Sequence, residues 1–335
     1  MNKTIDHLAD LGKRLSASEE MKEAIARAAN KNPWFDERFV QYAVDAVVHE
    51  MLNAQQLNEW LSRYQLKPVD KTIGLIFAGN LPLVGFHDFL CCYVAGCRMK
   101  IKLSSKDDEL FLLVLKTLQE IDPSLQSKVE LVDRLKDFDA VIATGSNNTH
   151  RYFEYYFRDY PKVLRKNRNS VAILSGEETP EQLEQLADDI FLYFGFGCRN
   201  VSKLYVPVDY DFARLFPHFE KYKWLHQHTK YMNNYDYNRT LLLLNNTPHL
   251  SNDFVMITEN ASIPSPVSVL YYEHWHDERI LQTQLKLNEE KIQCVVSQKP
   301  EQWKLPSSVA FGQSQHPALW DYADGVDTVS FLLGL

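Results

Sequence analysis

The 335-residue sequence predicts an α/β protein with a doubly wound parallel sheet and two domains. Short apolar runs alternate with longer amphipathic stretches from residue 72 onward, which is typical of parallel βαβ units. The composition, 45% hydrophobic and 24% charged, is that of a globular chain. A single core for a chain of this length would be large, so two domains are the better expectation.

The first 70 residues are expected to be helical. Ser16 and Glu19 have the spacing of a capping box ahead of a helix, and a second helical stretch is expected over residues 37–63. Residues 67–70 include Pro68 and break the helical pattern. After this break we expect strands at 72–78, 99–103, 128–132 and 139–144, and helices at 82–96, 108–121 and from about 147.

The remaining chain is predicted to form a second α/β domain. The expected strands lie at 170–174, 203–208, 239–244, 254–258, 267–272 and 292–297, and the expected helices at 179–193 and 276–287.

Charge and hydropathy argue against several classes of partner. The net charge of -8 gives no electrostatic reason to expect a nucleic acid or an anionic membrane. The longest strongly apolar run, residues 89–97, is far shorter than the ~20 residues of a membrane helix. The N-terminal residues lack the apolar region of a signal peptide, so we expect a cytoplasmic protein.

The cysteines and histidines predict neither disulfides nor a metal site. Five cysteines form no C-x-x-C pair, and the odd number argues against a disulfide framework. The two H-x-H pairs, His226/His228 and His274/His276, have no known ligand spacing, so polar structural histidines are expected.

The twelve glycines exclude the usual nucleotide-binding signatures. The only G-x-G is at residues 195–197, and Asn200 stands where a dinucleotide fingerprint needs its third glycine. Gly74 and Gly79 have the spacing of a phosphate-binding P-loop, but Asn80 and the following leucine replace its Lys and Ser/Thr.

The G-x-G pair leads directly into a cysteine, Cys198, at the expected junction of a helix and a strand. Glycines there let a substrate approach the backbone closely, and the adjacent Arg199 favours a thiolate. On this local evidence alone, a buried structural cysteine is the commoner outcome.

Polar residues follow three of the expected strands. Asn80 follows the first, Lys102 and Ser104 the second, and Gly145 and Ser146 a later one. Ligands of open α/β sheets bind outside the carboxyl ends of strands, where an amide can stabilise an oxyanion and a lysine can pair with a phosphate or ribose. Singly, each also has an ordinary structural explanation, such as an asparagine in a turn.

The order of these segments resembles the aldehyde dehydrogenase superfamily. G-N-L-P-L at 79–83, K-L-S at 102–104, T-G-S at 144–146 and G-F-G-C at 195–198 are similar to that family's N-F-P-L turn, K-P-S strand end, T-G-S helix start and G-Q-x-C nucleophile loop. The cysteine loop looks most like that of the acyl-CoA reductases of the bacterial luminescence type. The resemblance covers about residues 72–208 and implies an aldehyde-dehydrogenase-like fold that binds NAD(P) without a glycine fingerprint.

The resemblance implies a role for each matching residue. Cys198 corresponds to the catalytic nucleophile, and Asn80 corresponds to the amide that stabilises the oxyanion together with the Cys198 backbone N–H. Lys102 and Ser104 correspond to contacts with the adenosine ribose. The pyrophosphate contacts correspond to Gly145 and Ser146.

Cofactor preference and a further ribose contact also follow from the resemblance. Ser105 stands where many NAD-specific relatives have a glutamate, and Lys100 and Lys106 are nearby, so NADPH is expected, with NADH as the alternative. Glu259 matches the glutamate that holds the nicotinamide ribose, although its spacing to the following prolines is longer than the family's.

One departure favours reduction over oxidation. Hydrolytic relatives carry a glutamate in an E-L-G-G-K segment that activates water, whereas residues 163–170 here contain no carboxylate. Reduction of an acyl thioester needs no such water, since hydride replaces it. We therefore expect an NAD(P)H-dependent reductase of acyl-CoA or an acyl-carrier thioester that forms an aldehyde through an acyl-cysteine.

Two alternatives stay open: a cysteine acyltransferase or thioesterase without nicotinamide, and a catalytically silent binding protein of the same fold. The short chain leaves little sequence for the family's oligomerisation strands, so formation of a homo-oligomer is also open. The expected division is a helical segment at 1–70, an NAD(P)-binding domain at 71–176, and a smaller catalytic domain at 177–310 with its nucleophile loop at 195–200. Residues 311–335 are expected to return to the first domain.

Overall fold

The structure is a computed structural model that describes residues 2–16, 18–145, 147–303, 305 and 307–335. The chain forms two compact units. The first unit comprises residues 1–167 and 316–335, and the second comprises residues 168–315. The functional division into a cofactor-binding and a catalytic domain stays a prediction.

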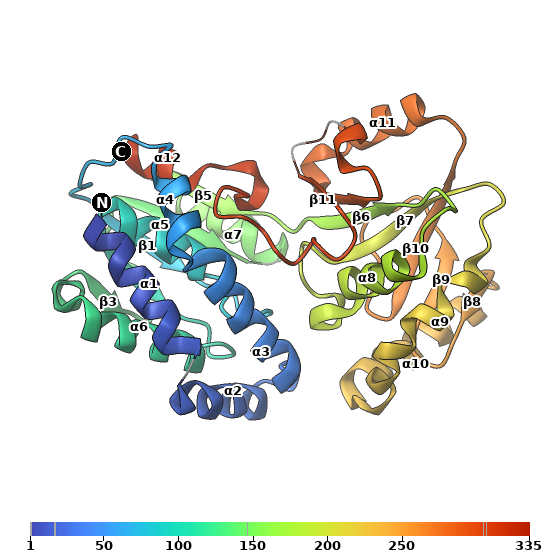
Figure 1. Cartoon of the computed structure of the whole chain (residues 1–335), viewed down its shortest axis with the longest axis horizontal. Helices are drawn as coiled ribbons and strands as arrows, with labels where there is room; N and C mark the ends of the chain where they lie inside the picture. Colours follow the sequence, from blue (N-terminus) through green and yellow to red (C-terminus); the bar gives the residue numbers. More distant parts are fainter. Residues whose placement is uncertain (1, 17, 146, 304, 306) are drawn as a thin grey trace. The chain divides into compact units, whose positions relative to one another are not determined.

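The first unit contains a five-stranded sheet in which every pairing is parallel. Its order is β3-β2-β1-β4-β5, so successive strands run outward from β1 in one direction and then continue from β4 in the other. This order confirms the predicted doubly wound class. The strands are β1 (Thr72–Ile76), β2 (Arg98–Lys102), β3 (Val129–Leu131), β4 (Ala140–Thr144) and β5 (Lys162–Arg165). Three of these strands, β1, β3 and β5, are labelled in Figure 1.

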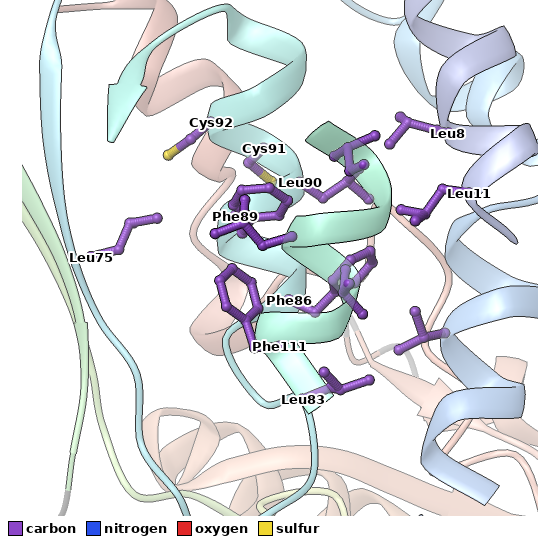
Figure 2. Close-up of a cluster of buried hydrophobic side chains, with 14 of the residues drawn as sticks. Leu8, Leu11, Leu75, Leu83, Phe86, Phe89, Leu90, Cys91, Cys92 and Phe111 are labelled. Atoms are coloured by element: carbon purple, nitrogen blue, oxygen red, sulfur yellow. The ribbon is translucent and has the colours of Figure 1, made fainter. Parts of the chain in front are cut away.

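Apolar helix faces build the core of this unit. The connecting helices are α5 (Phe86–Ala95), α6 (Glu109–Ile121) and α7 (Asn147–Tyr156). Figure 2 shows Phe89 of α5 and Phe111 of α6 between Leu75 of β1 and Leu8 of the first helix, α1. The two phenylalanine rings meet edge to face at 5.1 Å, a favourable geometry for aromatic pairs.

The N-terminal helices pack on this core, and their presence confirms the helical prediction for residues 1–70. They are α1 (Asn2–Ser16), α2 (Glu19–Lys31), α3 (Glu37–Ala46), a π-helical turn (Val47–Met51) and α4 (Ala54–Leu61). The predicted capping box of Ser16 with Glu19 is wrong, because Ser16 ends α1. Ser18 instead caps α2, and its hydroxyl accepts a hydrogen bond from the Met21 N–H at 3.1 Å.

A buried arginine ties the C-terminal segment into the first unit. Arg165, at the end of β5, donates hydrogen bonds to the Asp88 carboxylate at 2.6 Å, the Thr328 hydroxyl at 2.7 Å and the Ala323 carbonyl at 2.6 Å. Thr328 begins the last helix, α12 (Thr328–Leu333). Arg165 and Asp88 are both buried. Each neutralises the charge of the other, which would be costly to bury alone.

The second unit is built on a seven-stranded sheet of order β12-β11-β6-β7-β10-β9-β8. All pairings are parallel except that of β8 with β9. Its strands are β6 (Asn169–Ile173), β7 (Val201–Pro207), β8 (His249–Ser251), β9 (Met256–Glu259), β10 (Val269–Trp275), β11 (Ile292–Ser297) and β12 (Ser308–Val309). Its helices are α8 (Pro180–Phe191), α9 (Phe216–Phe219), α10 (Thr229–Leu244) and α11 (Glu278–Leu287).

The strand predicted at 239–244 is wrong, because these residues form the last turns of α10. The helix buries Tyr231, Tyr235 and Asn238, whose spacing of four and three places them on one face. The consecutive leucines at 241–244 lack this periodicity and are mostly exposed, so their apolar character alone indicated a strand incorrectly.

Candidate functional site

In the first unit, the predicted cofactor residues and Asn80 follow the carboxyl ends of neighbouring strands. Ile76 of β1 is in register with Lys102 of β2 and with Ala143 of β4. The parallel register therefore brings Asn80, Lys102, Ser104 and Gly145 to the same edge of the sheet. Asn80 and Lys102 are exposed, and Ser104 and Gly145 are half-buried. Ser146 lies outside the described residues.

Gly79 and Ser104 bring the first two of these strand ends into direct contact. A Cβ atom on Gly79 would lie 2.2 Å from the Ser104 hydroxyl oxygen and 2.8 Å from its Cβ. Any larger residue would force the two loops apart, which explains why glycine stands before Asn80.

This edge is chemically suited to a dinucleotide. The strand order reverses between β1 and β4, and ligands of doubly wound sheets bind outside the strand ends at such a switch point. Gly79 follows β1 and Gly145 follows β4, so small residues flank the switch point on both sides. The exposed Lys102 ammonium and the Ser104 hydroxyl can bind a phosphate or ribose.

In the second unit, Cys198 lies on a loop of unusual backbone conformation between α8 and β7. Tyr193, Phe194 and Gly195 all have left-handed backbones, with φ values of 53°, 59° and 76°. Non-glycine residues adopt this region at a cost and keep it only where the surroundings hold them. Here Phe194 is buried, and its ring lies 4.4 Å from the ring of His228.

Asn200 holds this loop in place. Its buried side-chain amide donates to the carbonyls of Leu192 at 2.8 Å and Asp189 at 3.2 Å, and its oxygen accepts from the Gly197 N–H at 2.8 Å. The amide thus links the end of α8 to the residue directly before Cys198. Asn200, which stands where a dinucleotide fingerprint would have its third glycine, therefore fixes the cysteine loop.

A serine supports Cys198 from the neighbouring strand. The Ser170 hydroxyl of β6 donates to the Cys198 carbonyl at 3.0 Å and accepts from the Cys294 N–H at 3.2 Å. Ser170 is completely buried, and so is its contact with the Cys294 N–H. Ser170 therefore holds the backbone of Cys198 itself, and Asn200 holds the backbone of Gly197 directly before it.

Exposure separates Cys198 from the other four cysteines. Cys198 is half-buried, whereas Cys91, Cys92, Cys97 and Cys294 are buried. Burial raises the pKa of Cys294 to about 11 and the pKa of Cys91 well above its ordinary value. A thiol must become a thiolate to act as a nucleophile, so these two are unsuited to that role.

The structure adds Asp189, a residue that the sequence did not indicate. Its carboxylate accepts hydrogen bonds from the Gly312 N–H at 2.7 Å and the Ser314 N–H at 3.0 Å. Arg199, next to Cys198, donates to the Ser314 carbonyl at 3.4 Å. Asp189 therefore fixes the segment to which the neighbour of Cys198 is bound.

Asp189 should make stability depend on pH. Burial raises its pKa from 3.8 to about 6, so the folded chain holds a proton that the unfolded chain releases. Stability should therefore fall as pH rises from about 4 to about 6, by an amount on the order of 2 kcal/mol. Asp189→Asn should flatten this interval in denaturant titrations at several pH values. An unchanged slope in the variant would contradict this assignment.

Glu259 occupies a different strand from the one that follows Cys198. It is the exposed last residue of β9 and pairs with Tyr272 of β10. Because β10 lies between β9 and β7 in the sheet, Glu259 is two strands away from β7. Its predicted ribose contact stays a prediction.

The H-x-H pairs contain histidines with structural partners. His228 caps α10, and its Nδ1 accepts from the Tyr231 N–H at 3.2 Å. His274 Nδ1 hydrogen-bonds the Pro207 carbonyl at 3.0 Å. Among the described residues, no group of three His, Cys, Asp or Glu side chains is placed to hold a metal ion. No helix in the described part of the chain is long and apolar enough to cross a membrane.

Comparison with known proteins gives a match by structure alone. The sequence matches no protein-family model and no curated protein. The structure of aldehyde dehydrogenase 21 from Physcomitrella patens, solved with the reaction product succinate, is similar to this chain with a TM-score of 0.67 and 12% sequence identity. The aligned region covers 99% of this chain and 82% of that protein.

Two further solved structures are similar. An aldehyde dehydrogenase from Bacillus cereus, solved with NAD+, has a TM-score of 0.64 and 13% sequence identity. The aligned region covers 92% of this chain and 74% of that protein. An acetylating aldehyde dehydrogenase from Geobacillus thermoglucosidasius has a TM-score of 0.64 and 9% sequence identity. The aligned region covers 95% of this chain and 84% of that protein. At such low identity, the matches establish the fold.

Proposed function

We propose that this chain, which has the aldehyde dehydrogenase fold, is an NAD(P)H-dependent reductase that converts an acyl-CoA or acyl-carrier thioester to an aldehyde. One observation carries the proposal. Of five cysteines, the one on the G-x-G-C loop is not buried, and Asn200 and Ser170 hold the backbone of that loop at Gly197 and Cys198. A cysteine that is not buried, on a backbone that is held in place, is suited to covalent catalysis.

The proposed reaction begins with the Cys198 thiolate. Its sulfur attacks the thioester carbonyl, the bond to the CoA sulfur breaks, and CoA leaves as a thiolate that takes a proton. The Asn80 amide and the Cys198 backbone N–H are the proposed donors to the oxyanion. The product of this half-reaction is an acyl thioester on Cys198.

Reduction completes the proposed cycle. The acyl group on Cys198 would be reduced at its carbonyl carbon by the hydride that NAD(P)H, when bound, would supply. Hydride addition would give the oxyanion of a thiohemiacetal on Cys198. As the carbonyl re-forms, the carbon–sulfur bond breaks, the aldehyde leaves and the thiolate is regenerated. One thioester, one NAD(P)H and one proton thus give one aldehyde, one CoA thiol and one NAD(P)+.

The segment that bears the water-activating glutamate in hydrolytic relatives supports reduction. Arg165 lies in this segment, at the end of β5, and its guanidinium is bound to Asp88. Residues 163–170 offer no carboxylate to activate water, so the acyl-cysteine lacks a general base for hydrolysis from this segment.

Cofactor binding is proposed for Lys102, Ser104, Gly145, Ser146 and Glu259, with NADPH preferred. Ser105 and Lys106 are both exposed, so this position presents no carboxylate that would repel a 2′-phosphate. The Lys100 ammonium, in contrast, donates to the Lys136 carbonyl at 2.9 Å. Lys106 is therefore the better placed of the two lysines to attract a 2′-phosphate.

The purified chain should oxidise NAD(P)H only when an acyl-CoA is present. We expect CoA thiol, measured with a thiol reagent, to appear in equal amount to the NAD(P)H consumed, across a series of acyl chain lengths. Release of CoA without NAD(P)H oxidation would instead indicate a thioesterase or acyltransferase. Neither signal with any acyl-CoA or acyl-carrier thioester would indicate a binding protein.

A further inference from the structure

The turn that carries Asn80 is anchored on both sides by buried contacts. On one side, Gly79 packs against Ser104, and its carbonyl accepts a hydrogen bond from the buried Asn32 side chain at 3.3 Å. The same Asn32 amide reaches the Lys106 carbonyl at 3.4 Å. The loop after β1 and the loop after β2 are therefore joined directly and through a shared partner.

On the other side, Leu83 has a strained backbone. Its φ is 55°, in the left-handed region that leucine rarely adopts, and its side chain is buried in the core (Figure 2). The Leu83 carbonyl accepts from the Phe86 N–H at 2.9 Å, so this residue leads directly into α5. Such a conformation persists only where neighbouring groups hold it.

Asp107 provides that hold from the loop after β2. One oxygen of its buried carboxyl accepts from the Leu83 N–H at 2.8 Å, and the other oxygen has no hydrogen-bond partner among the described residues. The adjacent Asp108 carries a like charge and is itself paired with Lys31 of α2 at 2.5 Å. Burial raises the pKa of Asp107 to about 7.

No cationic side chain among the described residues forms an ion pair with this buried carboxyl. A buried carboxyl without such a partner is costly to keep, so it calls for an explanation. The hydrogen-bond partner of the Asp107 carboxyl is the backbone N–H of Leu83, the strained residue. This hydrogen bond therefore stabilises the backbone conformation of the turn. Between the two anchors, Asn80 is exposed and Pro82 restricts the intervening backbone.

We propose that Asp107 is a positioning residue for Asn80. By accepting the Leu83 N–H, it holds the left-handed turn that orients the Asn80 amide relative to the strand ends of the first unit. This role rests on the proposed function, in which Asn80 stabilises the oxyanion. The carboxyl acts as a hydrogen-bond acceptor, so its charge is not required.

Three variants test this role in the full chain. Asp107→Ala removes the acceptor and should lower kcat about tenfold. Asp107→Asn keeps an acceptor oxygen and should retain kcat within about twofold. Asp108→Asn, the matched control on the next residue, should also leave kcat within about twofold.

A double-mutant cycle separates positioning from general damage. If Asp107 acts through Asn80, then Asp107→Ala should lower kcat little further in an Asn80→Ala background. Equal effects of Asp107→Ala in both backgrounds would overturn the proposal, as would failure of Asp107→Asn to restore kcat.

Hydrogen exchange tests the structural half without any assay of activity. Peptides covering residues 77–90 of the unliganded chain should exchange faster in Asp107→Ala than in wild type or Asp107→Asn. Unchanged exchange overturns the inference even if the wild-type chain is active. If the wild-type chain reduces no thioester, the proposed function and the catalytic role of Asp107 both fail, while faster exchange would still establish its hold on Leu83.

Discussion

Cys198→Ala should abolish thioester-dependent NAD(P)H oxidation, with a loss in kcat/KM of about 10³-fold or more. The physical reason is that the other four cysteines are buried, so none can replace the Cys198 thiolate as the attacking group. Incubation with an acyl-CoA in the absence of NAD(P)H should give a covalent acyl adduct, which mass spectrometry should locate on the peptide that contains Cys198. The adduct should be absent from the variant.

Cys91→Ala is a suitable control for this experiment. Cys91 is fully buried in α5 of the first unit, and the variant keeps the cysteine loop intact. It should retain both the adduct and the activity. Full activity in Cys198→Ala, or an adduct on another residue, would eliminate the proposed mechanism.

Asn200→Ala should produce the largest loss of stability among the substitutions considered. The variant removes the acceptor for the Gly197 N–H and the donor for the Leu192 and Asp189 carbonyls, all close to the cysteine loop. Leaving buried polar groups without partners costs about 1–3 kcal/mol each, so we expect a total loss of about 3–5 kcal/mol. Denaturant unfolding followed by fluorescence and circular dichroism should report it.

The control for this variant is Asn233→Ala. Asn233 is exposed on α10 of the same unit, so its replacement should change the free energy of unfolding by less than about 0.5 kcal/mol. Activity should fall in Asn200→Ala even under conditions where the chain remains folded, because the backbone before Cys198 loses its anchor. Equal stability of the two variants would contradict the role given to Asn200.

Much of the fold could be predicted because it depends on local patterns. Apolar runs such as residues 72–78 and 292–297 correspond to the strands β1 and β11, which are paired on both edges and buried on both faces. Local patterns also misled in two places. Ser16 has capping-box spacing, yet the hydroxyl that caps α2 belongs to Ser18, and the leucines at 241–244 extend a helix.

The candidate site was predictable only where its chemistry is local. Cys198 and Asn80 stand out through the glycines beside them. Asp107 and Asp189 do not, because their partners are distant in sequence: Leu83 for the first, Gly312 and Ser314 for the second. Asp107 is 24 residues from its partner and Asp189 is more than a hundred residues from both of its partners, so neither contact leaves a periodic or compositional signal and only tertiary structure reveals it.

The chain passes from the first unit to the second after Asn167 and returns to the first unit after Gln315. This order has a consequence for folding during synthesis on the ribosome. The second unit is one continuous stretch, so it can fold as soon as its own residues have emerged. The first unit cannot complete its core until the last segment arrives, since Leu319, Val329 and Leu332 belong to that core and the Trp60 indole donates to the Tyr322 hydroxyl at 2.8 Å. Residues 1–167 are therefore synthesised before the second unit, but the core that they form is completed after it.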